Sequence, residues 1–180
     1  QDGTNNFVNG VSDFCSMVAL MWNGVPVQCW IWLPVTQILY YAAAGDGAHR
    51  YHDNMSSALR IGHRPVDPLD MSGSGNTKGL IEPRKSQVLN RMRMISGRHY
   101  IGSAGVLATR IADGTEDFLI HSRATPWDHA PVDLLCREAG GHAAMVAGAK
   151  PFNAVDDGAI MAASSLTGWQ HLHQHVWRDD

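Results

Sequence analysis

The stretch 125–141, TPWDHAPVDLLCREAGG, constrains the fold of this chain most, because signals for a helix start and a helix end coincide in it with an acidic side chain. Thr125 is suited to cap a helix, Pro126 to occupy its first position, and Asp128 to place a negative charge where the helix dipole favours one. Gly140 and Gly141 supply the left-handed residue that ends many helices. The stretch therefore predicts a helix of about four turns. Its expected apolar face consists of Trp127, Ala130, Pro131, Leu134 and Leu135.

A second acidic motif lies far from this helix in the sequence, where the chain opens with QDGTNNFVNG. Asp128 taken alone is explained by helix capping. In the opening motif, however, Asp2 offers a carboxylate, Gly3 lets backbone amides approach an anion closely, and Thr4 adds a hydroxyl. The two stretches together predict a site for a metal ion and a phosphate group.

At these two stretches the chain resembles the inositol monophosphatase family of magnesium-dependent, lithium-sensitive phosphatases. That family's first signature runs Asp-Pro-(Ile/Leu/Val)-Asp-Gly-Thr-x-Asn-Phe, and its second runs Trp-Asp-x-Ala and ends in Glu-Ala-Gly-Gly. The segments GVPVQCWIWLPVT and GSAGVLATRIADG are also similar to bacterial members, so the resemblance extends over nearly the whole chain. It implies a layered α/β sandwich of the inositol monophosphatase and sugar phosphatase type. The signature residues present are Asp2, Gly3, Thr4, Asn6, Phe7, Trp127, Asp128, Ala130, Leu134, Glu138, Ala139, Gly140 and Gly141.

The resemblance also implies roles for the residues of both signatures. By their positions, Asp2 and Asp128 are expected to bind Mg²⁺, a hard cation that prefers oxygen ligands. Thr4 is expected to orient the nucleophilic water, which with Asp2 makes it a catalytic residue. The amides of Gly3 and Thr4 are expected to bind phosphate oxygens. The implied activity is that of a phosphoric monoester hydrolase that uses two metal ions to activate water.

Substrate recognition is expected at two further places. Gly102, Ser103 and Ala104 fall where the family lines its substrate pocket with backbone amides. His121 stands where animal inositol phosphatases hold an inositol hydroxyl with a Glu, and a neutral imidazole can also bond a hydroxyl. The expected partner is a small phosphorylated molecule, either inositol monophosphate or a related sugar or polyol phosphate. Specificity for histidinol phosphate or a nucleotide phosphate is the alternative within the enzyme class.

The sequence departs from the family pattern at its start, since it opens inside the first signature with Gln1 in an aliphatic position. The first Asp of that signature and an upstream metal-binding Glu are absent. We interpret the chain as the C-terminal portion of one domain, with the end of an antiparallel sheet region in 1–48 and an α/β subdomain in 80–180. The isolated chain is then expected to show little or no turnover. A non-catalytic fragment or regulatory binding protein with the same fold is the competing hypothesis, and an exposed sheet edge favours a homodimer or aggregation.

Composition indicates a globular cytoplasmic domain. The chain has 180 residues, 44% of them hydrophobic and 17% charged, with a net charge of −3. This balance gives no reason to expect nucleic acid or a membrane as the main partner, and no apolar run approaches the ~18 residues of a membrane span. Cys15, Cys29 and Cys136 are few, odd in number and widely spaced, so we expect reduced core thiols.

The remaining pattern predicts a meander followed by an α/β half. Asn23-Gly24 indicates a hairpin between strands at 14–22 and 25–32, a third strand follows at 38–44, and the polar segment 49–79 is expected to be a loop. Expected helices cover 84–94, 102–114 and 164–177, and expected strands cover 118–121, 142–146 and 159–163, with partly parallel pairing.

Three other features are given structural interpretations. The glycines of SGSGNTKG lack Walker spacing, so a linker is favoured over a phosphate loop. The aromatic residues of the meander are interpreted as core or sheet packing. The basic residues of the 84–94 helix indicate a solvated face, and the histidines of the last helix indicate a surface helix end. These two sets are Arg84, Lys85, Arg91 and Arg93, and His171, His173 and His175.

Overall fold

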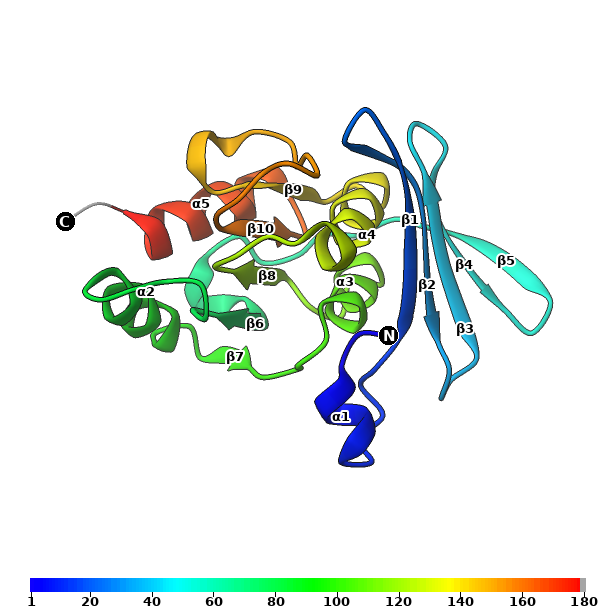
Figure 1. Ribbon diagram of the computed structural model, residues 1–180, viewed down its shortest axis with the longest axis horizontal. Coiled ribbons are helices and arrows are strands. Elements are labelled where there is room, and N and C mark those ends of the chain that lie inside the picture. The colour runs from blue at the N-terminus through cyan, green and yellow to red at the C-terminus, as the bar shows by residue number, and fades with distance from the viewer. Residues whose placement is uncertain (179–180) are drawn as a thin grey trace.

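A computed structural model describes residues 1–178 as two five-stranded sheets with helices between and beside them (Figure 1). An antiparallel sheet forms one outer layer, helices α3 (Ala104–Ala112) and α4 (Pro126–Glu138) form the next, a mixed sheet follows, and α2 (Arg84–Arg93) and α5 (Leu166–Trp177) cover its far side. This arrangement confirms the predicted layered α/β sandwich. A short helix, α1 (Thr4–Val8), lies at the N-terminal end of the chain.

The outer sheet is a simple antiparallel meander, with its strands in sequence order. Asn23 and Gly24, both with positive φ (49° and 79°), form the tight turn between its first two strands, which confirms the predicted hairpin. The meander is longer than expected, because two further strands follow the three that were predicted. The strands are β1 (Ser16–Trp22), β2 (Val25–Leu33), β3 (Ile38–Ala43), β4 (Gly47–His52) and β5 (Met55–Leu59).

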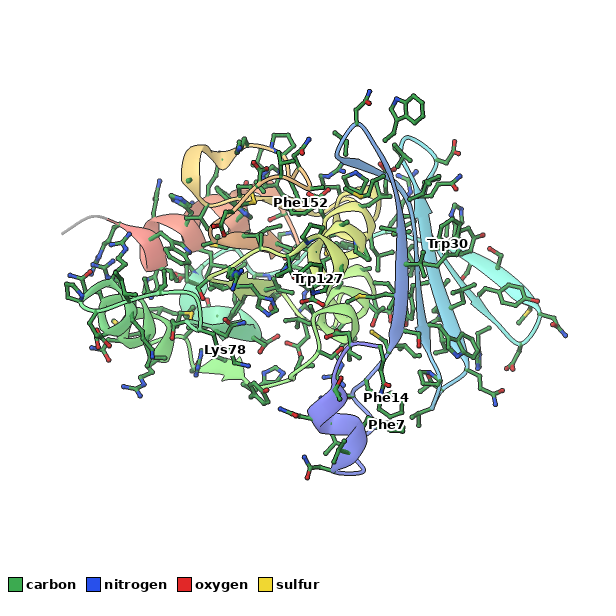
Figure 2. The ribbon with its side chains drawn as sticks, viewed as in Figure 1. Phe7, Phe14, Trp30, Lys78, Trp127 and Phe152 are labelled. Carbon is green, nitrogen blue, oxygen red and sulfur yellow. The ribbon has the colours of Figure 1, made fainter. Side chains whose placement is uncertain are left out.

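One face of this outer sheet is buried and the other is open. Along β2, Cys29 and Ile31 are fully buried and join a core that includes residues of α3 and α4. Trp30, between them, points to the opposite side and remains 38% exposed. Figure 2 shows Trp30 on the side of the sheet away from the two helices. The interpretation of the meander aromatics as packing therefore holds for Tyr40, which is buried, whereas Trp22 is exposed.

The inner sheet has the order β7-β6-β8-β10-β9. β6 pairs in parallel with both β7 and β8, and the other pairs are antiparallel, so the predicted partly parallel pairing is confirmed. Its two faces are both covered: Phe118 and Ile120 pack with side chains of α2 and α5, and Leu119 packs with side chains of α3 and α4. The strands are β6 (Ser72–Asn76), β7 (Gly97–His99), β8 (Phe118–His121), β9 (His142–Met145) and β10 (Ile160–Ala163).

The prediction of a loop over 49–79 was wrong, because the segment contributes to three strands and one short helix, η1 (Pro68–Asp70). β6 is the least expected of these, since its sequence is SGSGN. A Cβ at Gly73 would lie 2.3 Å from the carbonyl oxygen of Phe118, so the neighbouring strand approaches too closely for any side chain. Glycine in this strand is required by tertiary packing. A prediction from the local sequence, which takes glycine as a sign of a turn, misses this cause.

The predicted apolar face of α4 is correct except at its first residue. Ala130, Pro131, Leu134 and Leu135 are all buried, but Trp127 is 72% exposed. Pro131 is accommodated inside the helix. Among residues 1–178, no helix combines the length and the apolarity that crossing a bilayer would require.

The Glu-Ala-Gly-Gly end of the second signature has a structural role. Both carboxylate oxygens of Glu138 accept hydrogen bonds from backbone amides of the β3–β4 turn, Gly45 N at 3.1 Å and Gly47 N at 3.0 Å. Gly140 has a φ of 95° and ends α4. A Cβ at Gly141 would lie 2.6 Å from the carbonyl oxygen of Ala163 in β10. The motif therefore joins α4 to both sheets.

Candidate active site

A pocket of about 260 Å³ lies where the N-terminal ends of α3 and α4 meet the carboxyl ends of β6 and β8. Most of the predicted site residues line it, although they come from widely separated parts of the chain. They are Asp2, Gly102, Ser103, Ala104, His121 and Asp128.

Asp2 is held in the pocket by the start of α3. Its backbone pairs with Cys15 through N···O distances of 2.8 and 3.0 Å. Its side-chain Oδ2 accepts hydrogen bonds from the hydroxyl of Ser103 at 2.6 Å and from the backbone amide of Gly105 at 2.9 Å. Ser103 also caps α3 by accepting a bond from the amide of Val106. The helix end therefore neutralises and orients one oxygen of the carboxylate, and Oδ1 has no hydrogen-bond partner within residues 1–178.

Asp128 has a comparable arrangement at the start of α4. The hydroxyl of Thr125 donates to its Oδ2 at 2.9 Å, while Oδ1 forms no hydrogen bond with any described residue. Thr125 has the extended backbone of an N-cap, but its side chain bonds the Asp128 carboxylate instead of a helix amide. The prediction of a Thr125 side-chain cap was therefore wrong. The hydroxyl serves instead to orient Asp128.

The two carboxylates suit a hard cation. Each has one oxygen fixed by the protein and one free of protein partners, and Mg²⁺ is commonly held by one or two carboxylates together with waters and substrate phosphates. Within residues 1–178, no three His, Cys, Asp or Glu side chains gather where they could share a metal ion. The side chains present therefore fit Mg²⁺ as two oxygen ligands of an incomplete shell.

Gly3 and Thr4 lie next to Asp2 but do not line the pocket. Gly3 has a φ of 82°, and a Cβ there would lie 2.8 Å from the carbonyl oxygen of Asp13, so the turn requires glycine. Thr4 begins α1 and is exposed. Phe7 anchors this short helix by packing edge to face on Phe14, with ring centroids 5.1 Å apart (Figure 2).

His121 forms part of a histidine pair on the pocket wall. Its Nδ1 lies 2.9 Å from Nε2 of His129, and the backbone N–H of Thr125 donates to Nδ1 of His129 at 2.9 Å. Burial, followed by the neighbouring His129 and Lys78, lowers the pKa of His121 to about 3. Burial also lowers the pKa of His129. Both imidazoles are thus neutral at physiological pH.

The thiol nearest the site is unreactive. Burial, reinforced by the adjacent Asp2 carboxylate, raises the pKa of Cys15 to about 12. All three cysteines are buried and free, in agreement with the prediction of reduced core thiols. The three histidines of α5 were interpreted as a surface helix end, and in the structure His171 is exposed while His173 and His175 are half-buried. Each lies within hydrogen-bond distance of a backbone carbonyl oxygen, at 3.1 to 3.2 Å.

Several pocket residues were missed by sequence reasoning. Lys78 falls in the segment that was interpreted as a linker, and Arg123 and His129 lie just before and within the second signature, at positions that the resemblance leaves variable. Ser74 and Asn76 belong to the unpredicted strand β6. Had β6 been identified as a parallel strand, its carboxyl end would have indicated these residues, because ligands bind at that end of such sheets.

Comparison with known proteins agrees with the geometry. A profile of the inositol monophosphatase family matches residues 2–179, which is nearly the whole chain. The chain belongs to the inositol monophosphatase family.

Individual relatives differ in what they are named for. The inositol-1-monophosphatase of Rhizobium meliloti is 33% identical over 176 residues, which make up 95% of this chain and 61% of that protein. The 3'(2'),5'-bisphosphate nucleotidase CysQ of Aggregatibacter actinomycetemcomitans is 31% identical over 141 residues, covering 78% of this chain and 51% of that protein. The structure of the Thermotoga maritima IMPase superposes with a TM-score of 0.79 at 26% identity, covering 97% of this chain and 65% of that one. The chain thus spans between half and two thirds of the length of these relatives.

Proposed function

We propose that this chain carries part of the active site of a Mg²⁺-dependent phosphomonoesterase that hydrolyses inositol monophosphate or a related sugar or polyol phosphate. One observation carries the proposal: Asp2 and Asp128, which are far apart in the sequence, line one pocket, and each keeps one carboxylate oxygen free of partners within residues 1–178. Family membership supports the reaction class.

Contacts within the chain support the roles of Asp2, Asp128, Ser103 and Thr125, whereas the roles of Gly3 and Thr4, which do not line the pocket, rest on the family signature. Asp2 and Asp128 would hold Mg²⁺ through their free oxygens. When bound, the metal supplies Lewis-acid chemistry that neutralises charge on the phosphoryl oxygens and activates water. Ser103 and Thr125 keep the two carboxylates in place, one hydrogen bond each. Thr4 is proposed to orient the attacking water, and the amides of Gly3 and Thr4 to bind phosphate oxygens.

Substrate recognition is proposed at other residues that line the same pocket. Gly102, Ser103 and Ala104 lie at the start of α3, and His121 lies at the end of β8. The neutral imidazole of His121 can bond a substrate hydroxyl without bringing a charge. The named activities of the relatives, inositol-1-monophosphatase and bisphosphate nucleotidase, support a phosphate ester as substrate and leave its alcohol portion to be tested.

The first test is binding, because it does not require a complete set of metal ligands. Mg²⁺ together with inorganic phosphate should raise the melting temperature of this chain, since ligands that bind only the folded state stabilise it. The Asp128→Asn variant should lose the shift, and Asp46→Asn, which changes an exposed acid away from this pocket and from the hollow that adjoins it, should retain it. The absence of any Mg²⁺-dependent shift in the unmodified chain would overturn the proposal.

Turnover separates the enzyme from a binding protein of the same fold. The panel contains inositol 1-phosphate, histidinol phosphate, fructose 1,6-bisphosphate and an adenosine bisphosphate, each with and without Mg²⁺. Phosphate release that Asp128→Asn abolishes would support catalysis by this chain and identify the substrate class. An Asp128-dependent stabilisation without release would instead support the second candidate, a chain that binds without turning over, which is favoured by the presence of only two acidic ligands in the described pocket.

A further inference from the structure

Two cationic side chains that line the pocket form no ion pair with an acidic residue in 1–178. Lys78 and Arg123 line the candidate active site, and they also line an adjoining hollow of about 560 Å³. Both side chains are exposed. Neither forms an ion pair with any residue in 1–178. Asp157 also borders the hollow, but its carboxylate accepts a hydrogen bond from the amide of Gly158 at 2.8 Å.

The fold holds these two cations side by side. Asn76 and His121 are register partners at the carboxyl ends of the parallel strands β6 and β8. Lys78 and Arg123 each follow two residues later, so the two chains leave the sheet together (Figure 2 marks Lys78 beyond the end of β6). A Cβ on Gly79 would lie 2.8 Å from Cβ of Arg123, which shows how closely the two segments run.

Hydrogen bonds fix the same two segments to each other. The amide of Gly79 donates to the hydroxyl of Ser122 at 2.8 Å, and that hydroxyl donates to Oδ1 of Asn76 at 3.3 Å. The amide of Lys78 donates to the same Asn76 oxygen at 3.2 Å. Because the backbones are joined in this way, the two cationic side chains start from neighbouring positions, and an anion bound between them is attracted by both charges.

The histidine pair adds a neutral nitrogen to the pocket wall. Nδ1 of His129 lies within hydrogen-bond distance of both the backbone N and the carbonyl oxygen of Thr125, at 2.9 and 3.1 Å, so both tautomers of the pair fit these contacts. In both, Nε2 of His121 is the ring nitrogen that has no partner within the described chain. His121 therefore brings no charge to the pocket wall, and the positive charge there comes from Lys78 and Arg123.

We propose that Lys78 and Arg123 form a subsite for a second anionic group of the substrate, so that the pocket prefers a sugar bisphosphate to the matching monophosphate. The inference rests on the proposed function for the first phosphate, which is placed near Asp2 and Asp128. These four side chains line one pocket, so one small ligand can contact both ends. Several oxygens on one phosphate can accept from two cations at once, whereas a hydroxyl cannot.

The test compares the binding of fructose 1,6-bisphosphate and fructose 6-phosphate to this chain by titration calorimetry at low ionic strength. The bisphosphate should bind about tenfold more tightly, a preference that should shrink as salt is added. The double variant Lys78→Met/Arg123→Met should lose the preference while still binding the monophosphate. Lys85→Met, which removes an exposed charge from α2 away from the pocket, should retain it. Equal affinities for the two sugars, or a preference unchanged in the double variant, would overturn the inference.

The two proposals can fail separately. Asp128→Asn should abolish Mg²⁺-dependent stabilisation and leave the bisphosphate preference in place. If the unmodified chain shows the preference but no Mg²⁺-dependent stabilisation, the proposed function fails and the anion subsite stands. If Mg²⁺ and phosphate stabilise the chain but the two sugar phosphates bind equally, the subsite fails alone. Thermal unfolding of each variant confirms that the substituted chain is folded.

Discussion

The two sheets have the same number of strands but differ in how many of their faces are buried. The inner sheet is covered on both faces, and its interior strand β10 has every residue buried. The outer sheet is covered on one face, so burial alternates along β1 from residue to residue. The sequences reflect this difference: Ile160–Ala163 is uniformly apolar, whereas an alternating strand exposes Val18 and Leu20 to the far side.

The site belongs almost entirely to the doubly covered region. Its pocket is formed by the ends of β6 and β8 and by the starts of α3 and α4, all of which are fixed by packing on more than one side. The outer sheet is linked to it through Cys15, the residue before β1, whose backbone pairs with Asp2. The comparison indicates that the inner layers provide the rigidity on which ligand geometry depends, and that the outer sheet supports them from one side.

The largest expected effect comes from making the same substitution, Leu→Ala, once in each sheet and comparing the two losses of stability. Leu119→Ala in β8 removes a fully buried side chain, and we expect a loss of about 3 kcal/mol in the free energy of unfolding. Leu20→Ala in β1 truncates a side chain that is 52% exposed, and we expect a loss below about 1 kcal/mol. Urea unfolding of both variants measures the difference. A Leu20→Ala cost equal to that of Leu119→Ala would mean that another surface covers the outer sheet in solution.

Low pH should lower the free energy of unfolding through His121, which lies at the end of β8 in the inner sheet. Its pKa is about 3 in the folded chain and 6.5 ordinarily, because burial disfavours the charged form. Between these values the unfolded state binds more protons, so stability rises with pH and is lost as the pH falls below about 6.5. His121→Gln keeps hydrogen-bonding groups but cannot titrate. It should reduce the slope of unfolding free energy against pH by about 1.4 kcal/mol per pH unit in that window.

The control for this prediction is the same pair of proteins above pH 7.5, where the two slopes should coincide because neutral His121 neither binds nor releases a proton. Urea unfolding at a series of pH values gives both slopes. An identical slope for the variant and the unmodified chain between pH 4 and 6.5 would contradict burial of a neutral His121.

A smaller effect is expected where the layers are joined. Glu138→Gln replaces one of the two carboxylate oxygens that bind the amides of Gly45 and Gly47 by an amide group that cannot accept. We expect a loss of about 1 kcal/mol in unfolding free energy, with increased amide hydrogen exchange confined to the β3–β4 turn. Asp70→Asn, on an exposed residue whose carboxylate forms no hydrogen bond within residues 1–178, is the control for the loss of charge. Unchanged exchange at Gly45 and Gly47 would contradict the role assigned to Glu138.

The elements that could be predicted from sequence are those whose local pattern agrees with their packing. The strand at Phe118–His121 and the helix beginning at Pro126 have the predicted bounds at these positions because apolar runs, proline and acidic side chains act locally. β6 could not be predicted, since its Gly73 is required by the close approach of Phe118 on a neighbouring strand, and that contact is not visible in the local sequence. β5 was missed because four of its five residues are exposed, which leaves no apolar alternation.

The candidate site divides in the same way. Asp2 and Asp128 were indicated by motifs and lie in one pocket, as the resemblance led us to expect. Lys78 and Arg123 were not, because their proximity depends on the pairing of β6 with β8, and that pairing is invisible while β6 is read as a loop. Trp127 shows the converse error: helical spacing placed it on the apolar face, but it lies in the first turn, before the helix is fully packed.

The smallest expected effect concerns the open face of the outer sheet. Trp30 pairs across the strands with Val18 and Tyr41, and the three form an apolar surface on the uncovered side. Trp30→Thr keeps a residue that favours strands, so stability should change by less than about 0.5 kcal/mol, yet binding of a hydrophobic dye should fall. Val155→Thr, which alters an 87% exposed side chain outside the sheets, should leave dye binding unchanged. Equal dye binding by the Trp30 variant and the unmodified chain would show that this face is covered in solution. The difference in burial between the two sheets would then hold for the single chain but not for the assembled protein.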